Sequence, residues 1–323
     1  MRNLLQIFIL ALVLAGLSLP AAAQGGSLSG PVLGYAPDSD GVRPIRGIAG
    51  ASLLGERLPL GFATSAVEVS PGQDYVLAVS AEDGLVRVLG LGVEPLTAST
   101  IEGIAPAPDC LILSPRGSAA LIVGSDEGRA WVVTGLPAAP TAATLNLAGV
   151  SGQPDAWAVS DDGSTVLAAT GTGLFLVTVE GARPLPSAGA VTALAFLPGS
   201  LDALAAGAGQ VAVLSDTAGQ PAWRVAGTFA EEFGDAVAVA AARGRAFVAG
   251  NRSVAVVDLE TGAVSEFAGS CQVTGLARLS GEAFRLTGVS AEPMWMIEGS
   301  DEPRLLFIPP VPPAPAAAEE EGR

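Results

Sequence analysis

Short apolar stretches alternate with turn-forming residues along most of the chain. In the stretch Ser65–Ser70, for example, Val67 and Val69 occupy alternate positions, as in a half-buried β-strand. A turn follows, then a second apolar stretch, and no long segment shows the period of an amphipathic helix. We therefore predict an all-β fold.

The turns recur at a regular interval, which is the strongest signal in the sequence. Successive turn glycines are separated by 45, 46, 36, 45 and 37 residues. This spacing is close to the roughly 40–45 residues of a four-stranded propeller blade. The glycines concerned are Gly72, Gly117, Gly163, Gly199, Gly244 and Gly281.

Each repeat contains enough strand-like stretches for one blade. A single sheet of this kind cannot bury both faces, so we expect the repeats to stack around a common axis. The strands predicted in the first repeat are Ser65–Ser70, Tyr75–Ser80, Leu85–Leu91 and a weaker Leu96–Ile101. Those predicted in the fifth are Ala236–Ala240, Ala246–Gly250, Ser253–Leu259 and Ala263–Phe267.

The repeats resemble those of a known superfamily. Turns of the Ser-Pro-x-Gly kind, followed by strands such as Val86–Val88 or the segment Val254–Gly262, are similar to WD40-like and YVTN-type β-propellers. The resemblance covers roughly residues 30–310, and the Gly-His and Trp-Asp signatures of true WD40 repeats are absent. It implies a β-propeller fold and leaves the function open.

The number of blades depends on the N-terminal segment. Six repeats run from Thr64 to Pro309, and a hairpin of Val32–Ala36 and Val42–Ile48 precedes them. With Ser52–Leu60 as a third strand, this segment predicts a seventh blade, partly built from the N-terminus and docked beside Arg304–Ile308. Six blades with an appended hairpin are the alternative.

Both ends of the chain differ from the repeats. Residues 1–23 are typical of a secretory signal peptide, with an apolar run Leu4–Leu19 and small residues before a cleavage site at Gln24. No later stretch is long and apolar enough to span a bilayer. Residues 24–308 then form the propeller, and residues 309–323, rich in Pro, Ala and Glu, form a disordered tail. The protein is expected in the periplasm or outside the cell.

Composition excludes several kinds of chemistry. The chain has no His, all of its 16 basic residues are Arg, and its net charge is −16. A Ser-His-Asp triad, a His metal ligand and a Schiff-base lysine are therefore excluded. The negative charge argues against nucleic acid, which proteins bind by neutralising phosphates. Cys110 and Cys271 lie in distant repeats, so we expect free thiols rather than a disulfide.

Carboxylates recur where the inner strands begin. Counting back from the turn glycines places Asp109, Asp155 and Asp235 near the starts of these strands. Equivalent positions of a radial repeat lie on one ring, so these residues predict a ligand-binding rim, although Asp also suits such turns for local reasons. Turns on the same rim add Glu82, Asp83, Asp126 and Glu127. Calcium fits such oxygen ligands, and we expect no other cofactor.

These observations favour a non-catalytic role. We expect an exported, monomeric propeller scaffold that binds a protein or a small cationic ligand. The alternative is a lactonase- or quinoprotein-like enzyme whose channel carboxylates hold calcium. A structural envelope protein that uses the tail as a spacer is a third hypothesis.

Overall fold

A computed structural model describes residues 30–39, 41–92, 96–124, 128–187, 189–207, 209–269, 271–290, 292–300 and 302–310. The predicted signal peptide, residues 1–23, and residues 311–323 of the predicted tail lie outside this range. Within it, the chain from Pro31 onward forms one compact unit.

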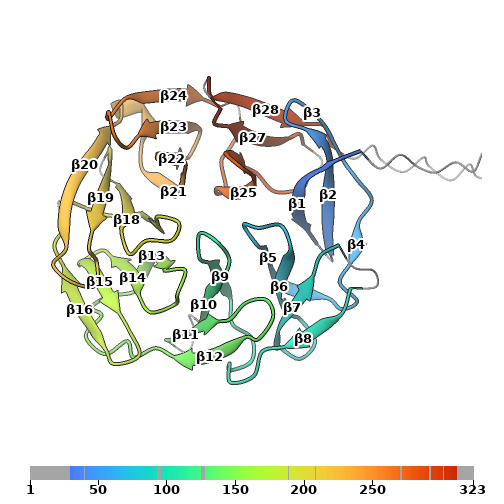
Figure 1. Ribbon diagram of the computed structural model, residues 1–323, viewed down its shortest axis with the longest axis horizontal. Helices are drawn as coiled ribbons and strands as arrows, with labels where there is room; N and C mark the ends of the chain where they lie inside the picture. The colour runs from blue at the N-terminus through green and yellow to red at the C-terminus, as the bar shows by residue number, and fades with distance from the viewer. Residues whose placement is uncertain are drawn as a thin grey trace, which may run out of the picture. The chain divides into compact units, whose positions relative to one another are not determined.

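Seven antiparallel sheets stand in a ring around a common axis (Figure 1). The predicted all-β fold is therefore confirmed, as are the seven blades, six predicted from the turn spacing and one from the N-terminal segment. In the described residues, helical structure is limited to the 3-10 turn η2 (Glu231–Phe233). Blades 2 to 7 each place four consecutive strands side by side in chain order.

The strands of the first four blades have the following bounds. Blade 1 contains β1 (Val32–Asp38), β2 (Gly41–Ile48), β3 (Ala51–Leu54) and β4 (Leu58–Pro59). Blade 2 contains β5 (Thr64–Val69), β6 (Tyr75–Ser80), β7 (Val86–Gly90) and β8 (Ala98–Thr100). Blade 3 contains β9 (Cys110–Leu113), β10 (Ala119–Gly124), β11 (Arg129–Thr134) and β12 (Thr141–Thr144). Blade 4 contains β13 (Pro154–Val159), β14 (Val166–Thr170), β15 (Gly173–Val177) and β16 (Ala182–Leu185).

The remaining three blades complete the ring. Blade 5 contains β17 (Ala193–Phe196), β18 (Ala203–Gly207), β19 (Gln210–Ser215) and β20 (Ala222–Thr228). Blade 6 contains β21 (Ala236–Ala242), β22 (Arg245–Gly250), β23 (Ser253–Asp258) and β24 (Val264–Ala268). Blade 7 contains β25 (Ala277–Ser280), β26 (Ala283–Arg285), β27 (Met294–Glu298) and β28 (Arg304–Ile308).

The hydrophobic core is divided among the gaps between neighbouring blades. Side chains of one blade interdigitate with those of the next, as Leu77 of β6 does with Ile122 of β10. Such a cluster fills each of the seven gaps. The second strands supply much of it, and every residue of β6 and β10 is buried. Because each large apolar side chain contributes about 1.5–3 kcal/mol when buried, stacking stabilises the ring.

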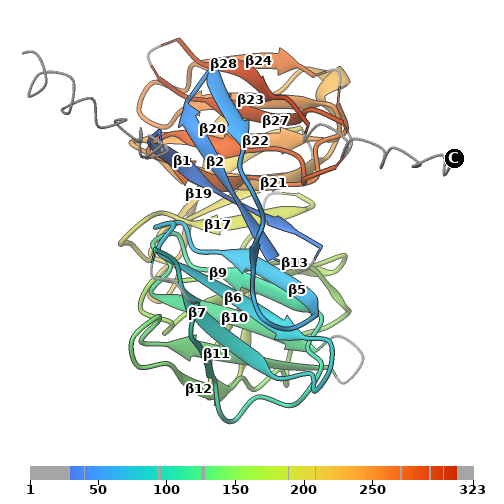
Figure 2. The same cartoon turned by 90° about the vertical axis from the view of Figure 1, so that its right-hand side faces the viewer.

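Blade 1 is built differently from the others. The sequence predicted one third strand over Ser52–Leu60, but the structure has two short strands, β3 and β4, which both pair with β2. The sheet is therefore three strands deep, and residues 32–59 supply all of its described strands. It lies between β28 and β5 (Figure 2), with β3 against β28, so its docking beside the last blade is as predicted.

The direction of β1 shows which strand of blade 1 is missing. Thr64, at the start of β5, donates a hydrogen bond from Oγ1 to the carbonyl oxygen of Ser39, just past the end of β1 (3.4 Å). β1 thus runs antiparallel to β5, as second strands do, and it lies farther from the centre of the ring than β5 and β25 (Figure 1). Among the described residues, blade 1 therefore has no strand in the innermost position.

A single side chain ties the ring together at this point. The amide oxygen of Gln73 accepts a hydrogen bond from the Tyr35 N–H of blade 1 (2.6 Å). Its amide nitrogen donates to the carbonyl oxygen of Arg278 in blade 7 (2.6 Å). Gln73 itself belongs to blade 2 and adopts a left-handed backbone conformation (φ 59°) in the turn after β5. Gln73 thus links blade 1 to both of its neighbours, blades 2 and 7.

Candidate ligand-binding site in the central channel

The channel contains a cavity of about 670 Å³. This volume falls in the range of pockets that bind small molecules, about 300–1,000 Å³. In blades 2 to 6 the cavity is lined by first strands and the turns that follow them. In blade 7 it also reaches Phe284 and Arg285 of the second strand. The wall therefore differs beside blade 1, where the innermost strand is missing.

One layer of the wall can be compared blade by blade. In blades 2 to 7, the residue two positions before the turn that ends the first strand borders the cavity. In blades 3 to 6 this position is apolar, whereas blades 2 and 7 place charged residues there. In blade order the residues are Glu68, Ile112, Ala158, Ala195, Ala240 and Arg278. Charge is thus confined in this layer to the two blades that flank blade 1.

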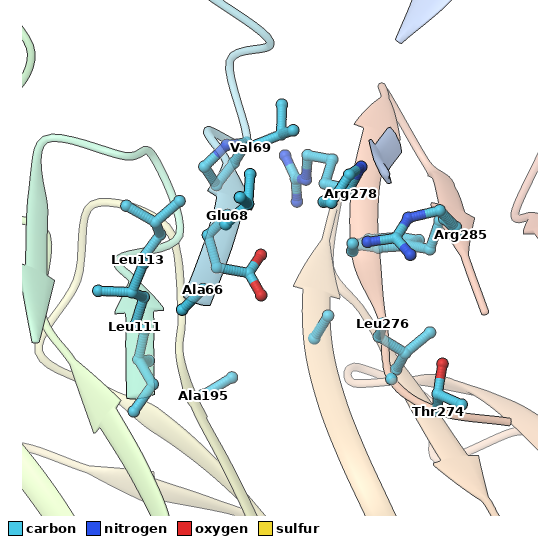
Figure 3. Close-up of a pocket in the computed structure, with 18 of the residues that line it drawn as sticks. Ala66, Glu68, Val69, Leu111, Leu113, Ala195, Thr274, Leu276, Arg278 and Arg285 are labelled. Carbon is cyan, nitrogen blue, oxygen red and sulfur yellow. The ribbon is translucent and has the colours of Figure 1, made fainter. Parts of the chain in front are cut away.

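Glu68 has no direct partner for its carboxylate. It is half-buried on β5, and Figure 3 shows the carboxylate pointing into the cavity, toward Arg285. Among the described residues, none donates a hydrogen bond to it or forms a salt bridge with it. Burial raises the pKa of Glu68, and the positive charge of Arg285 opposes this shift only in part.

Arg285 is incompletely satisfied as well. It is the third residue of β26, at a place where other second strands carry apolar side chains such as Leu121 of β10. One terminal nitrogen donates to the carbonyl oxygen of Thr287 (3.0 Å), but the buried Nε atom has no hydrogen-bond partner. Burial lowers the pKa of Arg285, and Glu68 opposes the shift. The guanidinium remains charged, because arginine is not deprotonated in proteins.

The Arg278 side chain makes contacts that stabilise the fold. Its guanidinium donates a hydrogen bond to the carbonyl oxygen of Ala241 in blade 6. It also lies over the ring of Phe284, 5.5 Å from the ring centre. Burial lowers its pKa, while the carboxylates of Asp161 and Glu282 act in the opposite direction. Of the two cavity arginines, only Arg285 has a buried nitrogen without a hydrogen-bond partner.

Asp38 provides a contrast to Glu68 within the same cavity wall. Arg43 and Arg57 each donate from Nε to its Oδ2 atom, at 2.6 and 2.9 Å, and the Ser39 N–H donates to Oδ1. Burial alone would raise the pKa of Asp38, but these hydrogen bonds outweigh it and lower the pKa. This carboxylate is fully engaged within the protein.

The rest of the cavity wall combines apolar side chains with hydroxyl groups, among them those of Thr64, Ser65 and Thr274. Leu111 and Leu113 of β9 project beside Glu68, and Leu276 lies below Arg285 (Figure 3). Trp157 of β13 borders the cavity on the opposite side of the ring. Glu68, Arg278 and Arg285 are partly withdrawn from water, since burial shifts the pKa of each, and their electrostatic interactions are therefore stronger than in water.

The mouth formed by the turns after the first strands is tied by hydrogen bonds between blades. Asp161 accepts from the Arg116 N–H with Oδ1 and from the Gly199 N–H with Oδ2, both at 2.7 Å, and so connects blades 3, 4 and 5. The Tyr75 hydroxyl donates to the carbonyl oxygen of Gly117 (2.6 Å). We call this end the tied mouth.

The opposite end carries the predicted carboxylate rim, and we call it the acidic mouth. Asp109 and Asp155 are exposed and occupy equivalent positions. Asp109 precedes Cys110, which pairs with Val123, and Asp155 precedes Ala156, which pairs with Ala169. Asp235 is also exposed, but it precedes β21 by one residue, and a bulge at the start of β21 places it two residues earlier in the repeat. Asp109 and Asp155 thus match in register, while Asp235 is offset.

The turn residues predicted for the acidic mouth differ in their surroundings. Glu82 is exposed, and Asp83 forms a salt bridge with Arg87, which lowers the pKa of its carboxyl. Asp126 and Glu127 lie outside the described residues. In the part of the chain that the structure describes, no three acidic or thiol side chains are grouped to hold a metal ion. Calcium binding at this mouth stays a prediction.

Both cysteines are free and partly buried. Cys110 begins β9, and burial is the main reason that the pKa of its thiol is raised, with Asp109 and Glu68 adding to the shift. Burial likewise raises the pKa of Cys271. Each thiol packs against a hydrophobic cluster between blades.

The fold and the cavity define the class of protein: a seven-bladed β-propeller with a mixed-charge cavity in its channel. Neither a family model nor a curated protein sequence matches the chain. Among the described residues, no helix is long and apolar enough to cross a membrane.

Solved structures share this fold. A functionally unknown protein from Desulfotomaculum acetoxidans DSM 771 matches with a TM-score of 0.58 and 11% identity, over 86% of this chain and 100% of the other. AztD from Citrobacter koseri matches with a TM-score of 0.54 and 11% identity, over 86% and 83%. Sqt1 from Chaetomium thermophilum matches with a TM-score of 0.51 and 15% identity, over 83% and 84%. At these identities the likeness is one of fold.

Proposed function

We propose that this protein is an exported, non-catalytic binding protein that holds a small ligand in its central cavity. One observation carries the proposal: Glu68 and Arg285 face the same cavity, and each has unused hydrogen-bonding capacity. Export rests on the signal-peptide pattern of residues 1–23. N-terminal sequencing of exported protein should give a start at or near Gln24, and a start at Met1 would contradict export.

The energetics support a binding role for these two groups. A charged side chain with unmet hydrogen bonds is costly when it is withdrawn from water, and the folded protein retains two of them in one cavity. A ligand that supplied the missing partners would recover this free energy on binding. A purely structural channel would gain more from apolar residues at both positions, as blades 3 to 6 have where blade 2 has Glu68 and as blade 3 has with Leu121 where blade 7 has Arg285.

The test is ligand-induced stabilisation of the purified exported protein. Differential scanning fluorimetry with amino acids, organic acids, amines and sugars should identify at least one compound that raises the Tm. Ala195 borders the cavity, so Ala195→Phe should fill part of it and abolish the shift. The control Ala263→Phe adds the same ring at an exposed residue and should keep the shift. No shift with any compound, or equal shifts in both variants, would refute the proposal.

A further inference from the structure

Resting on the proposed function, we infer that the cavity ligand is a small zwitterion with an apolar body, such as an apolar amino acid or short peptide, whose carboxylate binds Arg285 and whose ammonium binds Glu68.

The two charges lie on opposite sides of the cavity. Glu68 projects from blade 2 and Arg285 from blade 7, and they face each other across the cavity beside blade 1 (Figure 3). They influence each other electrostatically, yet no hydrogen bond or salt bridge joins them. A molecule placed between them meets positive charge on one side and negative charge on the other. A dipolar ligand complements both sides at once.

The carboxylate of the ligand is assigned to Arg285. The guanidinium presents several N–H donors in a planar fork that matches a carboxylate. At Arg285 one terminal nitrogen is bonded to the Thr287 carbonyl, and the buried Nε lacks an acceptor. Arg278 is a poorer candidate, because it already donates to Ala241 and stacks on Phe284.

The ammonium of the ligand is assigned to Glu68. The Glu68 carboxylate has no donor among the described residues, although it borders the same cavity. An anion without a positive group would bind Arg285 but would place its negative charge opposite Glu68. A cation alone would meet the reverse penalty at Arg285. Glu68 and Arg285 together therefore disfavour ligands with a single charge and favour zwitterions.

The body of the ligand is assigned to the apolar part of the wall. Leu111, Leu113 and Leu276 line the cavity around the two charges, and Trp157 borders it farther off. The volume of about 670 Å³ accommodates ligands up to drug size. An apolar side chain, or two in a short peptide, would remove this wall from water and add to the affinity.

The experiment is isothermal titration calorimetry on the purified exported protein. The zwitterionic probes are L-leucine and L-leucyl-L-leucine, N-acetyl-L-leucine carries only the negative charge, and L-leucinamide carries only the positive charge. We expect at least one zwitterion to bind and both singly charged probes to bind about 10- to 100-fold more weakly, the usual effect of losing one charged hydrogen-bonded contact. Glu68→Gln and Arg285→Met should each weaken zwitterion binding by a similar factor.

Matched controls come from the outside of blade 7. Arg304 and Glu298 form an exposed salt bridge there, so Arg304→Met and Glu298→Gln should leave the affinity unchanged. Arg285→Lys provides a second test if Arg285→Met folds poorly. Equal binding of N-acetyl-L-leucine and a zwitterion would overturn the inference and leave the proposed function standing. Failure of both zwitterions would also overturn it, while the wider thermal-shift panel decides the proposed function separately.

Discussion

The two sides of the channel place different kinds of side chain, apolar and charged, at the same strand position. On the side of blades 3 to 6, the layer two residues before each turn consists of Ile112 and three alanines, and the second strands behind it are almost wholly apolar. On the side of blades 7, 1 and 2, the same layer holds Glu68 and Arg278, and the second strand adds Arg285.

This difference coincides with the missing innermost strand of blade 1. Where the ring is complete, first strands separate the cavity from the second strands. Where it is incomplete, the cavity reaches β26, and Gln73 closes the ring with side-chain hydrogen bonds. Apolar packing between blades therefore stabilises both sides of the ring, whereas the side of blades 7, 1 and 2 also retains costly charged groups beside the cavity.

The largest effect is expected on the apolar side. Leu121 in β10 is fully buried, so Leu121→Ala should remove packing and leave a cavity that lowers the free energy of unfolding by about 2–5 kcal/mol. Urea denaturation followed by tryptophan fluorescence measures this change. A loss below about 1 kcal/mol would mean that apolar packing between blades is not the main source of stability.

Breaking the tie across blade 1 should have the next largest effect. Gln73→Ala leaves the Tyr35 N–H and the Arg278 carbonyl without their partner, which should cost about 2 kcal/mol. Gln153→Ala changes an exposed glutamine and serves as the control in the same denaturation experiment. Equal stability of the two variants would show that the ring closes without this side chain.

Glu68 should give the charged side a distinct pH dependence. Its folded-state pKa lies above its ordinary value of 4.5, so the folded protein binds this proton more tightly than the unfolded chain. The resulting stability is complete below about pH 4.5 and is lost as pH rises through the folded-state pKa. Glu68→Gln should therefore lessen the fall in stability over that range.

Denaturation at a series of pH values measures this difference. Glu82→Gln removes a carboxylate from an exposed turn and controls for the loss of one negative charge. If the profile of Glu68→Gln coincides with that of the wild type, burial of the Glu68 carboxyl has no thermodynamic consequence and the contrast between the two sides weakens.

The smallest change in stability is expected at the acidic mouth. Asp109, Asp155 and Asp235 are exposed, so replacing all three with Asn should alter stability by only about 0.5 kcal/mol per site or less without calcium. If the mouth binds calcium, as the sequence predicts, added calcium should raise the Tm of the wild type more than that of the triple variant. Identical responses would identify these residues as turn formers only.

Much of the fold could be predicted because it depends on local pattern. Turn spacing indicated the number of blades, and the predicted strand Tyr75–Ser80 agrees with β6. The split of Ser52–Leu60 into β3 and β4 could not be foreseen, since it depends on how both segments pair with β2.

The cavity residues were missed for a physical reason. Alternation around Val67 and Val69 places Glu68 on the polar face of a strand, and only closure of the ring turns that face toward a cavity. Arg285 did leave a signal, because it is a charged residue in a second strand that is otherwise apolar. Gln73 resembled an ordinary turn residue, since its partners belong to blades distant in the sequence.

The most direct test of the account is the stability of Arg285→Met compared with the wild type. If Arg285 is retained for binding, it carries a cost to the folded protein, because its Nε lacks a partner and its charge is buried. Urea denaturation without ligand should therefore give a free energy of unfolding for Arg285→Met that equals or exceeds that of the wild type. A decrease of more than about 2 kcal/mol would contradict the account, since losses of that size mark a side chain whose interactions hold the fold together.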